Sequence, residues 1–319
     1  MSNIFDALQR AESENAGAES PPFSLATELL QVAEQKIRVS ALNVEQLGTE
    51  ERPTVDSLGS NAPAAAPAED VEREDLEHED LERCPVLPVS IREEGRLVSV
   101  GKEGSLGAEK FRFLAVRLHQ LRQSRPLKKI LITSTIPQEG KSTVATNLAC
   151  TLARRRAQKT LLLEGDLRRP SLAAQFGFGK IPGLCEWLSG QAGTINIYRL
   201  EGLGLWILPA GAAPQNPLEL MQSGKLSALM KQLETWFDWI VIDSPPVLPL
   251  ADASLWSRVA DGVLLVTRKD TTERQQLQRG LAAIEKSKLI GALVNSSANA
   301  AHSDYYERYN SSSANQTKQ

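Results

Sequence analysis

The sequence predicts an α/β fold, in which a doubly wound, mostly parallel sheet follows a disordered acidic N-terminal extension. From about residue 108 onward, short apolar runs typical of buried strands alternate with helical patterns. One apolar run, Ile130 to Ile132, leads into a glycine-containing loop and then into a helical pattern. Another run, Trp239 to Ile242, ends in a carboxylate, Asp243. Strands that alternate with helices in this way are expected to pair in parallel.

Composition bounds the possible functions. The 319 residues are 41% hydrophobic and 24% charged, which suits one large core with extensions. A net charge of −3 gives no general attraction to nucleic acid, so we expect no nucleic-acid partner. No apolar run approaches the ~20 residues of a membrane span and no signal peptide is visible, which favours a cytoplasmic protein. Cys84, Cys150 and Cys185 lack metal or redox spacing, and we expect free thiols.

The chain divides into four expected regions. Residues 1–39 hold two short amphipathic patterns, which predict either marginal helices or a docking element for a partner. Residues 40–100 are rich in Pro and Ala and then acidic, with nine carboxylates and two arginines between Glu69 and Arg83. This composition predicts a disordered linker. The folded domain is expected at residues 101–297, and residues 298–319 are expected to form a flexible tail.

A helical pattern begins at Ala108, with apolar residues at spacings of three and four and basic residues between them. Residues 181–237 read as structural, with a short helix at 184–188, a strand at 205–211 and a helical run at 217–236. Four tryptophans in and beside this stretch are expected to fill the core or an interface: Trp187, Trp206, Trp236 and Trp239. The remaining pattern predicts helix 251–258, strand 262–267, helix 273–286 and strand 289–295.

The loop after the first strand is a variant of the phosphate-binding P-loop. The pattern G-x-x-x-x-G-K-[ST] is met at Gly140, Lys141 and Ser142, but Thr135 replaces its first glycine. Backbone N–H groups of the loop can surround a phosphate at the helix N-terminus, where Lys141 reaches the β- and γ-phosphates and Ser142 the Mg²⁺. The alternative is an ordinary polar turn. The candidate nucleotide-binding residues are Thr135, Gln138, Glu139, Gly140, Lys141, Ser142 and Thr143.

Two further strands end in carboxylates. The run KTLLL is followed by Glu164 and Asp166 and then by two arginines, and the run WIVI is followed by Asp243. Because the carboxyl ends of parallel strands face the ligand crevice, these side chains are placed for nucleotide chemistry. An apolar strand that closes on Asp is also the Walker B pattern. Acidic residues can instead merely end a strand or cap a helix.

Three of the four tyrosines lie close together in the polar tail, at Tyr305, Tyr306 and Tyr309. No apolar neighbours explain them as core residues. They are candidate modification sites, and chance clustering is the alternative.

These motifs resemble the bacterial tyrosine kinases of capsule and exopolysaccharide synthesis, over roughly residues 100 to 310. That family has a P-loop of the form S-x-x-P-x-x-G-K-S, found here from Ser134 to Ser142. It also has an apolar run followed by D-x-D-x-R, found at Leu161 to Arg168 with Glu164 as the first acid. A Walker B strand and a C-terminal tyrosine cluster complete the pattern. The family's oligomer motif, E-x-x-R-x-x-R, is present only in part, at Glu109 and Arg112.

The resemblance implies a P-loop autokinase that uses ATP and Mg²⁺ to phosphorylate the tail tyrosines of a neighbouring subunit. It implies that Glu164 accepts the tyrosine proton and that Asn295 contacts the nucleotide. The implied catalytic set is Lys141, Glu164, Asp166 and Asp243, and the implied Mg²⁺ set is Ser142, Asp166 and Asp243.

The implied partners are further copies of the chain, contacted through Glu109 and Arg112, and a cognate tyrosine phosphatase. A separate membrane polysaccharide co-polymerase or adaptor would hold the kinase at the inner face of the membrane.

Two alternatives remain at this stage. An ATPase switch of the ParA/MinD type shares the fold, but the signature lysine early in its P-loop is here Ile136. A scaffold that binds nucleotide without kinase activity is favoured by Glu164, which replaces the family's aspartate.

Overall fold

The computed structural model describes residues 81, 83–91, 96–101, 105–248, 251–269 and 271–295. These residues belong to one compact unit, Arg73–Gln319. The expected docking element at residues 1–39, most of the expected linker and the three tail tyrosines lie outside the described residues.

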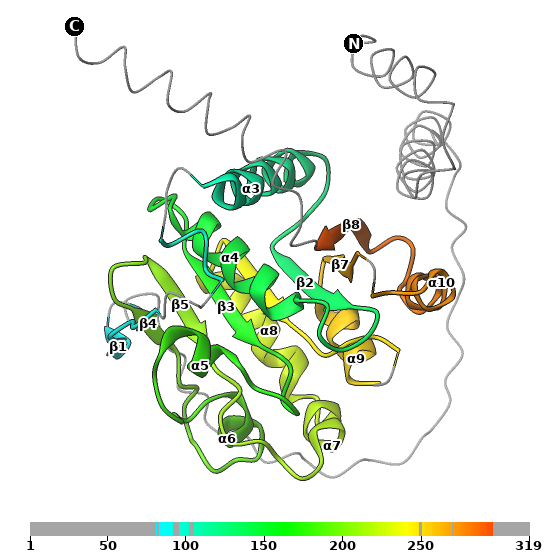
Figure 1. Cartoon of the computed structure of the whole chain (residues 1–319). Helices are drawn as coiled ribbons and strands as arrows, with labels where there is room; N and C mark the ends of the chain where they lie inside the picture. Colours follow the sequence, from blue (N-terminus) through cyan, green and yellow to red (C-terminus); the bar gives the residue numbers. More distant parts are fainter. Residues whose placement is uncertain are drawn as a thin grey trace, which may run out of the picture. The chain divides into compact units, whose positions relative to one another are not determined.

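The described residues form one eight-stranded sheet. Its strands are β1 (Val86–Leu87), β2 (Lys129–Ser134), β3 (Thr160–Glu164), β4 (Tyr198–Leu200), β5 (Leu205–Leu208), β6 (Trp239–Asp243), β7 (Gly262–Arg268) and β8 (Leu289–Asn295). They lie in the order β1-β4-β5-β3-β6-β2-β7-β8 (Figure 1). The β4–β5 pair is antiparallel, and every other neighbouring pair is parallel. The expected mostly parallel α/β sheet is thus confirmed.

Helices cover both faces of the sheet. They are α3 (Leu106–Ser124), α4 (Lys141–Ala153), α5 (Leu172–Phe176), α6 (Leu184–Leu188), α7 (Pro217–Gln222), α8 (Lys225–Trp236), α9 (Asp252–Val259) and α10 (Arg274–Ala282). Helices α3, α4 and α5 contribute to one apolar cluster, and α6 to α10 contribute to the cluster on the opposite face. The sheet is therefore doubly wound, as the sequence predicts.

The central strands are buried on both faces because their side chains are apolar at consecutive positions. In β3, Leu161 and Leu163 pack into one cluster and Leu162 into the other. Every residue of β2, β3 and β6 is buried. Side chains that alternate between two apolar layers explain why the sequence shows unbroken apolar runs at these strands.

The expected linker at residues 40–100 extends too far. Leu81 and Leu97 are buried, and β1 pairs with β4 at the sheet edge. A short apolar stretch follows the acidic run there and supplies this edge strand. The prediction rested on the acidic composition of this region and therefore missed the short apolar stretch.

The helical run expected at 217–236 is two helices, because Gly224 has a left-handed backbone with φ +77° between α7 and α8. The sequence patterns also missed α5 and β4, which are only five and three residues long. Of the four tryptophans expected in the core or at an interface, Trp236 and Trp239 are buried, and Trp187 and Trp206 pack partly buried against an apolar cluster.

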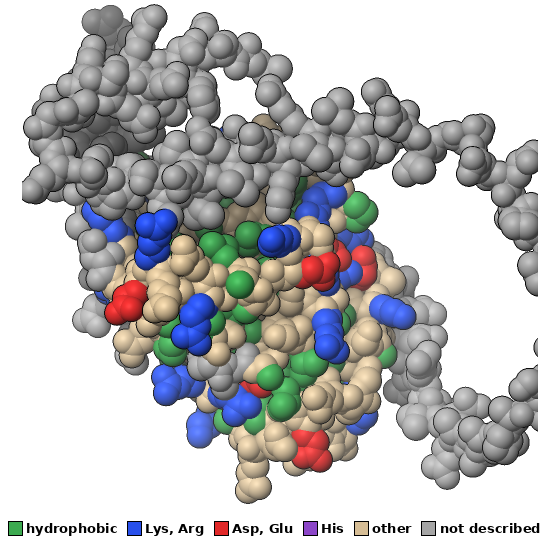
Figure 2. Space-filling view, turned by 90° about the vertical axis from the view of Figure 1, so that its right-hand side faces the viewer, with side chains coloured by type: hydrophobic (Ala, Val, Ile, Leu, Met, Phe, Trp, Pro, Cys, Tyr) green, Lys and Arg blue, Asp and Glu red, His purple; other side chains and the backbone are tan. Residues whose placement is uncertain are grey.

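The face turned to the viewer in Figure 2 is the right-hand side of Figure 1. Lys and Arg side chains are spread over it among neutral side chains, with few acidic ones between them (Figure 2). Within the described part of the chain, every helix is too short or too polar to cross a membrane.

Candidate nucleotide and phosphoryl-transfer site

Three functional side chains meet where adjacent parallel strands end. Lys141 opens α4, directly after the loop that follows β2, and Asp166 follows β3. Asp243 is the last residue of β6, and it pairs in register with Ile132 of β2 and with Glu164 of β3. Because β3, β6 and β2 are neighbours in the sheet, the P-loop and both expected aspartates lie on one edge.

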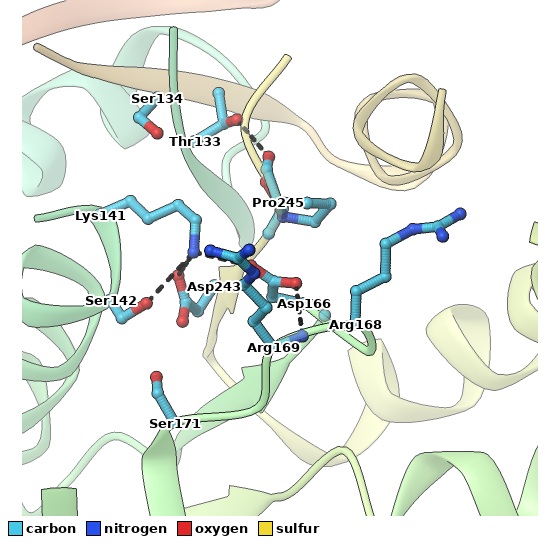
Figure 3. A network of polar contacts seen from close by, with 12 residues as sticks. Thr133, Ser134, Lys141, Ser142, Asp166, Arg168, Arg169, Ser171, Asp243 and Pro245 are labelled. Carbon is cyan, nitrogen blue, oxygen red and sulfur yellow. Dashed lines mark hydrogen bonds and ion pairs between the residues drawn. The ribbon is translucent and has the colours of Figure 1, made fainter. Parts of the chain in front are cut away.

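Lys141 is the centre of this group. Its Nζ lies 2.9 Å from Asp166 Oδ2 and 3.8 Å from Asp243 Oδ1. The same ammonium donates to Ser142 Oγ at 3.3 Å. Figure 3 shows the lysine reaching between the two carboxylates, with Ser142 beside it. The sequence-predicted residues Lys141, Ser142, Asp166 and Asp243 are thus brought together.

Burial and charge act in opposite directions on these groups. Burial would lower the pKa of Lys141, but the charges of Asp243 and Asp166 outweigh it, and the pKa is raised. Burial raises the pKa of Asp243 to about 6, although the lysine charge opposes this shift. Lys141 is therefore held charged.

Asp243 is the group best suited to a cation. It is fully buried, and among the described residues neither of its carboxylate oxygens has a hydrogen-bond partner of ordinary geometry. A buried carboxylate is costly unless it is closely paired, and the Lys141 ammonium, at 3.8 Å from Oδ1, is a distant ion-pair partner. Together with the Ser142 hydroxyl and Asp166, Asp243 offers the oxygen donors that Mg²⁺ prefers. The residues present fit the expected Mg²⁺.

The P-loop backbone turns sharply where the phosphate is expected. Gln138 has φ +68° and Gly140 has φ +90°, and the left-handed region is unusual for a side chain such as glutamine. Asn295, at the end of β8, lies against Gly140, and its Nδ2 donates to the Glu139 carbonyl at 2.9 Å. The expected nucleotide residue Asn295 is therefore beside the loop, and Thr143 lies in the first turn of α4.

The buried side chain of Glu139 anchors the P-loop. Its side chain is fully buried, and its Oε2 accepts from the Ile136 N–H at 2.8 Å. Its Oε1 accepts from the Arg268 N–H at 3.3 Å and from the Thr272 hydroxyl. These contacts join the P-loop to the segment between β7 and α10. Sequence patterns did not indicate Thr272, because its partner is distant in the chain.

Thr135 replaces the first glycine of the P-loop motif. Its side chain is fully buried, and a Cβ added at Gly280 of α10 would lie 2.9 Å from its Oγ1. The hydroxyl thus faces α10. The expected contact between Thr135 and the nucleotide stays a prediction.

Glu164 is buried and is held by three backbone amides. Its Oε1 accepts from the N–H groups of Ser171 and Leu172, the latter at 2.7 Å, and its Oε2 accepts from the Ala210 N–H at 2.9 Å. Both oxygens are already engaged. This environment differs from the one expected of a group that waits to accept a substrate proton.

The two arginines after Asp166 have separate roles. Arg168 turns away to α9 and pairs with Asp252, at 2.7 Å between Nε and Oδ2. The Arg169 N–H donates to Asp166 Oδ1 at 3.1 Å, and Figure 3 shows its side chain beside the carboxylates. Sequence reasoning did not select Arg169 as a site residue, although the double arginine was visible.

The partial oligomer motif lies on α3. Glu109 and Arg112 form an ion pair on the helix surface, whereas Ala115, at the third position of the motif, is buried. Phe113 and Val116 are the large apolar side chains of this helix with the greatest exposure, at 65% and 52%.

Comparison with protein-family models finds no match. Individual proteins are nevertheless clearly similar to this chain in sequence. Tyrosine-protein kinase YwqD of Bacillus subtilis is 32% identical over 217 residues, which cover 67% of this chain and 91% of the relative. Tyrosine-protein kinase CpsD of Streptococcus agalactiae serotype III is 33% identical over 187 residues, covering 57% of this chain and 80% of the relative.

Solved structures give the same result. The chimerical protein CapA2B2 is 31% identical with a TM-score of 0.59, covering 69% of this chain and 98% of that chain. The VpsO kinase domain is 33% identical with a TM-score of 0.52, covering 60% and 99%. With its P-loop, its paired aspartates and these relatives, the chain belongs to the bacterial tyrosine-protein kinases.

Proposed function

We propose that this protein is an ATP-dependent tyrosine autokinase that phosphorylates Tyr305, Tyr306 and Tyr309 of a neighbouring copy. Through this reaction it would regulate the synthesis and export of exopolysaccharide or capsule. The convergence of Lys141, Asp166 and Asp243 at one sheet edge is the observation that carries the proposal. The names of the relatives, which are tyrosine-protein kinases, support the reaction type.

The chain's own residues have distinct tasks in this reaction. When ATP binds, the Lys141 ammonium moves away from Asp166 and Asp243 to hold the β- and γ-phosphates, and the amides of the P-loop surround these phosphates. Ser142, Asp166 and Asp243 would hold Mg²⁺, directly or through water. When bound, Mg²⁺ would supply positive charge that offsets the negative charge developing during transfer. The buried position of the aspartates excludes water and strengthens these interactions.

The tail tyrosines are the better substrates among the four tyrosines. Tyr198 is buried in β4, and its hydroxyl donates to the Pro182 carbonyl at 3.1 Å. Burial raises its pKa further, which makes it a poorer nucleophile. A tail of residues 298–319 can deliver its tyrosines to an adjacent subunit.

We also propose assembly through α3. Glu109, Arg112, Phe113 and Val116 are spaced as one helical face, and two of them are exposed apolar residues. Arg112→Ala should shift the assembly towards monomer, and sedimentation that finds equal assembly would remove this role.

A separate membrane co-polymerase or adaptor would hold the kinase at the inner face of the cell membrane, contacted by residues 1–39 or by the core. A cognate phosphatase would reverse the modification. Fractionation that finds the protein wholly soluble in the presence of that membrane partner would contradict the first of these roles.

A nucleotide-binding scaffold without kinase activity is the second candidate. The backbone hydrogen bonds that occupy Glu164 favour it, because a family acid is replaced by one that is already engaged. Both candidates bind ATP, but they differ in whether tyrosine is phosphorylated.

The deciding experiment is incubation of the purified protein with labelled ATP and Mg²⁺, followed by mapping of the labelled residues. Lys141→Met should abolish tyrosine phosphorylation, because it removes the charge that faces the phosphates, while the far-ultraviolet circular dichroism stays unchanged. Lys128→Met is the matched control, since Lys128 precedes β2 at the opposite end of the strand and donates to the Glu234 carbonyl. Activity that is undiminished in Lys141→Met would sink the P-loop assignment.

A further inference from the structure

Glu164 joins two segments that are far apart in sequence. Its Oε1 accepts from Ser171 and Leu172, which end the turn after β3, and its Oε2 accepts from Ala210, which follows β5. The residue is 1% exposed. A carboxylate with three amide donors and almost no solvent contact is a cross-link between the two segments.

The turn whose end is hydrogen-bonded to Glu164 contains Asp166, a residue of the candidate site. Residues 165–171 run from the end of β3 to the start of α5 and include Asp166, which contacts Lys141 at 2.9 Å. Within this turn the Arg169 N–H donates to Asp166, and the side chain of Arg168, also in the turn, pairs with Asp252 of α9. Glu164 accepts hydrogen bonds from this turn at the point where it enters α5.

The length of the side chain matters for this geometry. An ionised carboxylate has about four acceptor positions on its two oxygens, and three are used here. Aspartate would keep the charge, but it is one methylene shorter. We expect that it cannot reach the Ser171–Leu172 amides on one side and Ala210 on the other at the same time.

We propose that Glu164 is a positioning residue that holds the 165–171 turn, and with it Asp166, against Lys141, and that it does not accept the tyrosine proton. The second half of this statement rests on the proposed kinase function, because it concerns the tyrosine reaction. The first half rests on the hydrogen bonds alone.

Two variants separate the two roles by their order. Glu164→Gln keeps the length and one strong acceptor, so the positioning role predicts a loss of about tenfold in kcat. Glu164→Asp keeps the carboxylate but loses the reach, and misplacement of Asp166 should cost on the order of 10²-fold. If Glu164 were the base, the order would reverse: Asp would remain active, and Gln would lose roughly 10²–10⁴-fold. An Asp variant more active than the Gln variant therefore overturns the proposal.

Amide hydrogen exchange provides a readout that needs no kinase activity. The amides of Ser171, Leu172 and Ala210 should be protected in the parent protein. In Glu164→Asp, protection should fall at one or both of these segments while β2 and β6 stay protected. Unchanged protection at both segments in Glu164→Asp would overturn the positioning role.

Two further measurements keep the outcomes distinct. Glu234→Gln is the matched control, because it removes a carboxylate paired with Lys129 at the opposite end of the strands and should leave kcat unchanged. If the parent protein phosphorylates no tyrosine, the proposed function fails. The positioning role is then judged by hydrogen exchange and by binding of Mg²⁺–ADP, which should weaken more in the Asp variant than in the Gln variant.

Discussion

Gly140 and Asn295 show how closely the P-loop backbone is packed at the scale of single residues. Gly140 has φ +90°, and a Cβ built on it would lie 2.2 Å from Asn295 Nδ2. The loop therefore needs glycine for two reasons, the left-handed backbone and the contact with β8. Because Asn295 also donates to the Glu139 carbonyl, a displacement of Asn295 disturbs the same loop.

Gly140→Ala should therefore weaken Mg²⁺–ATP binding by at least about tenfold, since the strained backbone and the clash shift the amides away from the phosphates. Equilibrium titration with a fluorescent ATP analogue measures this effect. Gly193→Ala is the matched control, because a Cβ at Gly193 meets nothing within 4 Å, and its affinity should be unchanged. Equal affinity in the two variants would contradict the role given to Gly140.

At the scale of elements, the strands and the strand-end acids could be predicted because the local sequence determines them. Buried parallel strands require apolar residues on both faces, and their carboxyl ends carry Asp166 and Asp243. Elements that depend on distant partners could not be predicted. β4 is three residues long and is defined by its pairing with β5 and β1, and the engagement of Glu164 depends on Ala210, 46 residues away.

The short helix α6 illustrates how a side chain fixes such an element. Glu186 caps the N-terminus of this helix: its Oε2 accepts from the Gly183 N–H at 2.7 Å, and its Oε1 accepts from the Ala212 N–H at 2.8 Å. Burial alone would raise the pKa of Glu186, but these backbone hydrogen bonds outweigh it and lower the pKa below 4.5.

Glu186→Gln should therefore destabilise the protein by about 1 kcal/mol at pH 7. A lowered carboxyl pKa contributes stability that is present above the unfolded value and is lost as pH falls through the folded value. The difference between parent and variant should accordingly shrink below pH 4.5. Urea unfolding at pH 7, 5 and 4 measures it, with the exposed Glu201→Gln as control. A difference that grows on acidification would contradict the assignment.

At the scale of the whole molecule, the described residues bring Lys141, Asp166 and Asp243 together, and the expected substrate tyrosines lie outside the described residues. β8 ends at Asn295, beside the P-loop, so the segment that bears the tyrosines begins at the nucleotide site. Tyr305 is ten residues further on, and an extended chain spans up to about 3.3–3.6 Å per residue. The tail could thus reach out of its own subunit towards another one.

Replacement of Tyr305, Tyr306 and Tyr309 together by Phe should remove most of the phosphate that the protein incorporates from ATP. ATP affinity should stay unchanged, because none of the three tyrosines belongs to the nucleotide-binding motifs around Lys141. Tyr198→Phe is the matched control, and its buried hydroxyl predicts undiminished incorporation.

Each phosphate adds about −1.5 to −2 charges at pH 7, so three would add roughly −5 to a segment that must approach the carboxylates of another subunit. Incubation with ATP and Mg²⁺ should therefore dissociate assemblies of the parent protein but not those of the Phe variant, as sedimentation would show. Undiminished phosphate on the Phe variant, mapped by mass spectrometry, would leave the kinase assignment without its proposed substrate.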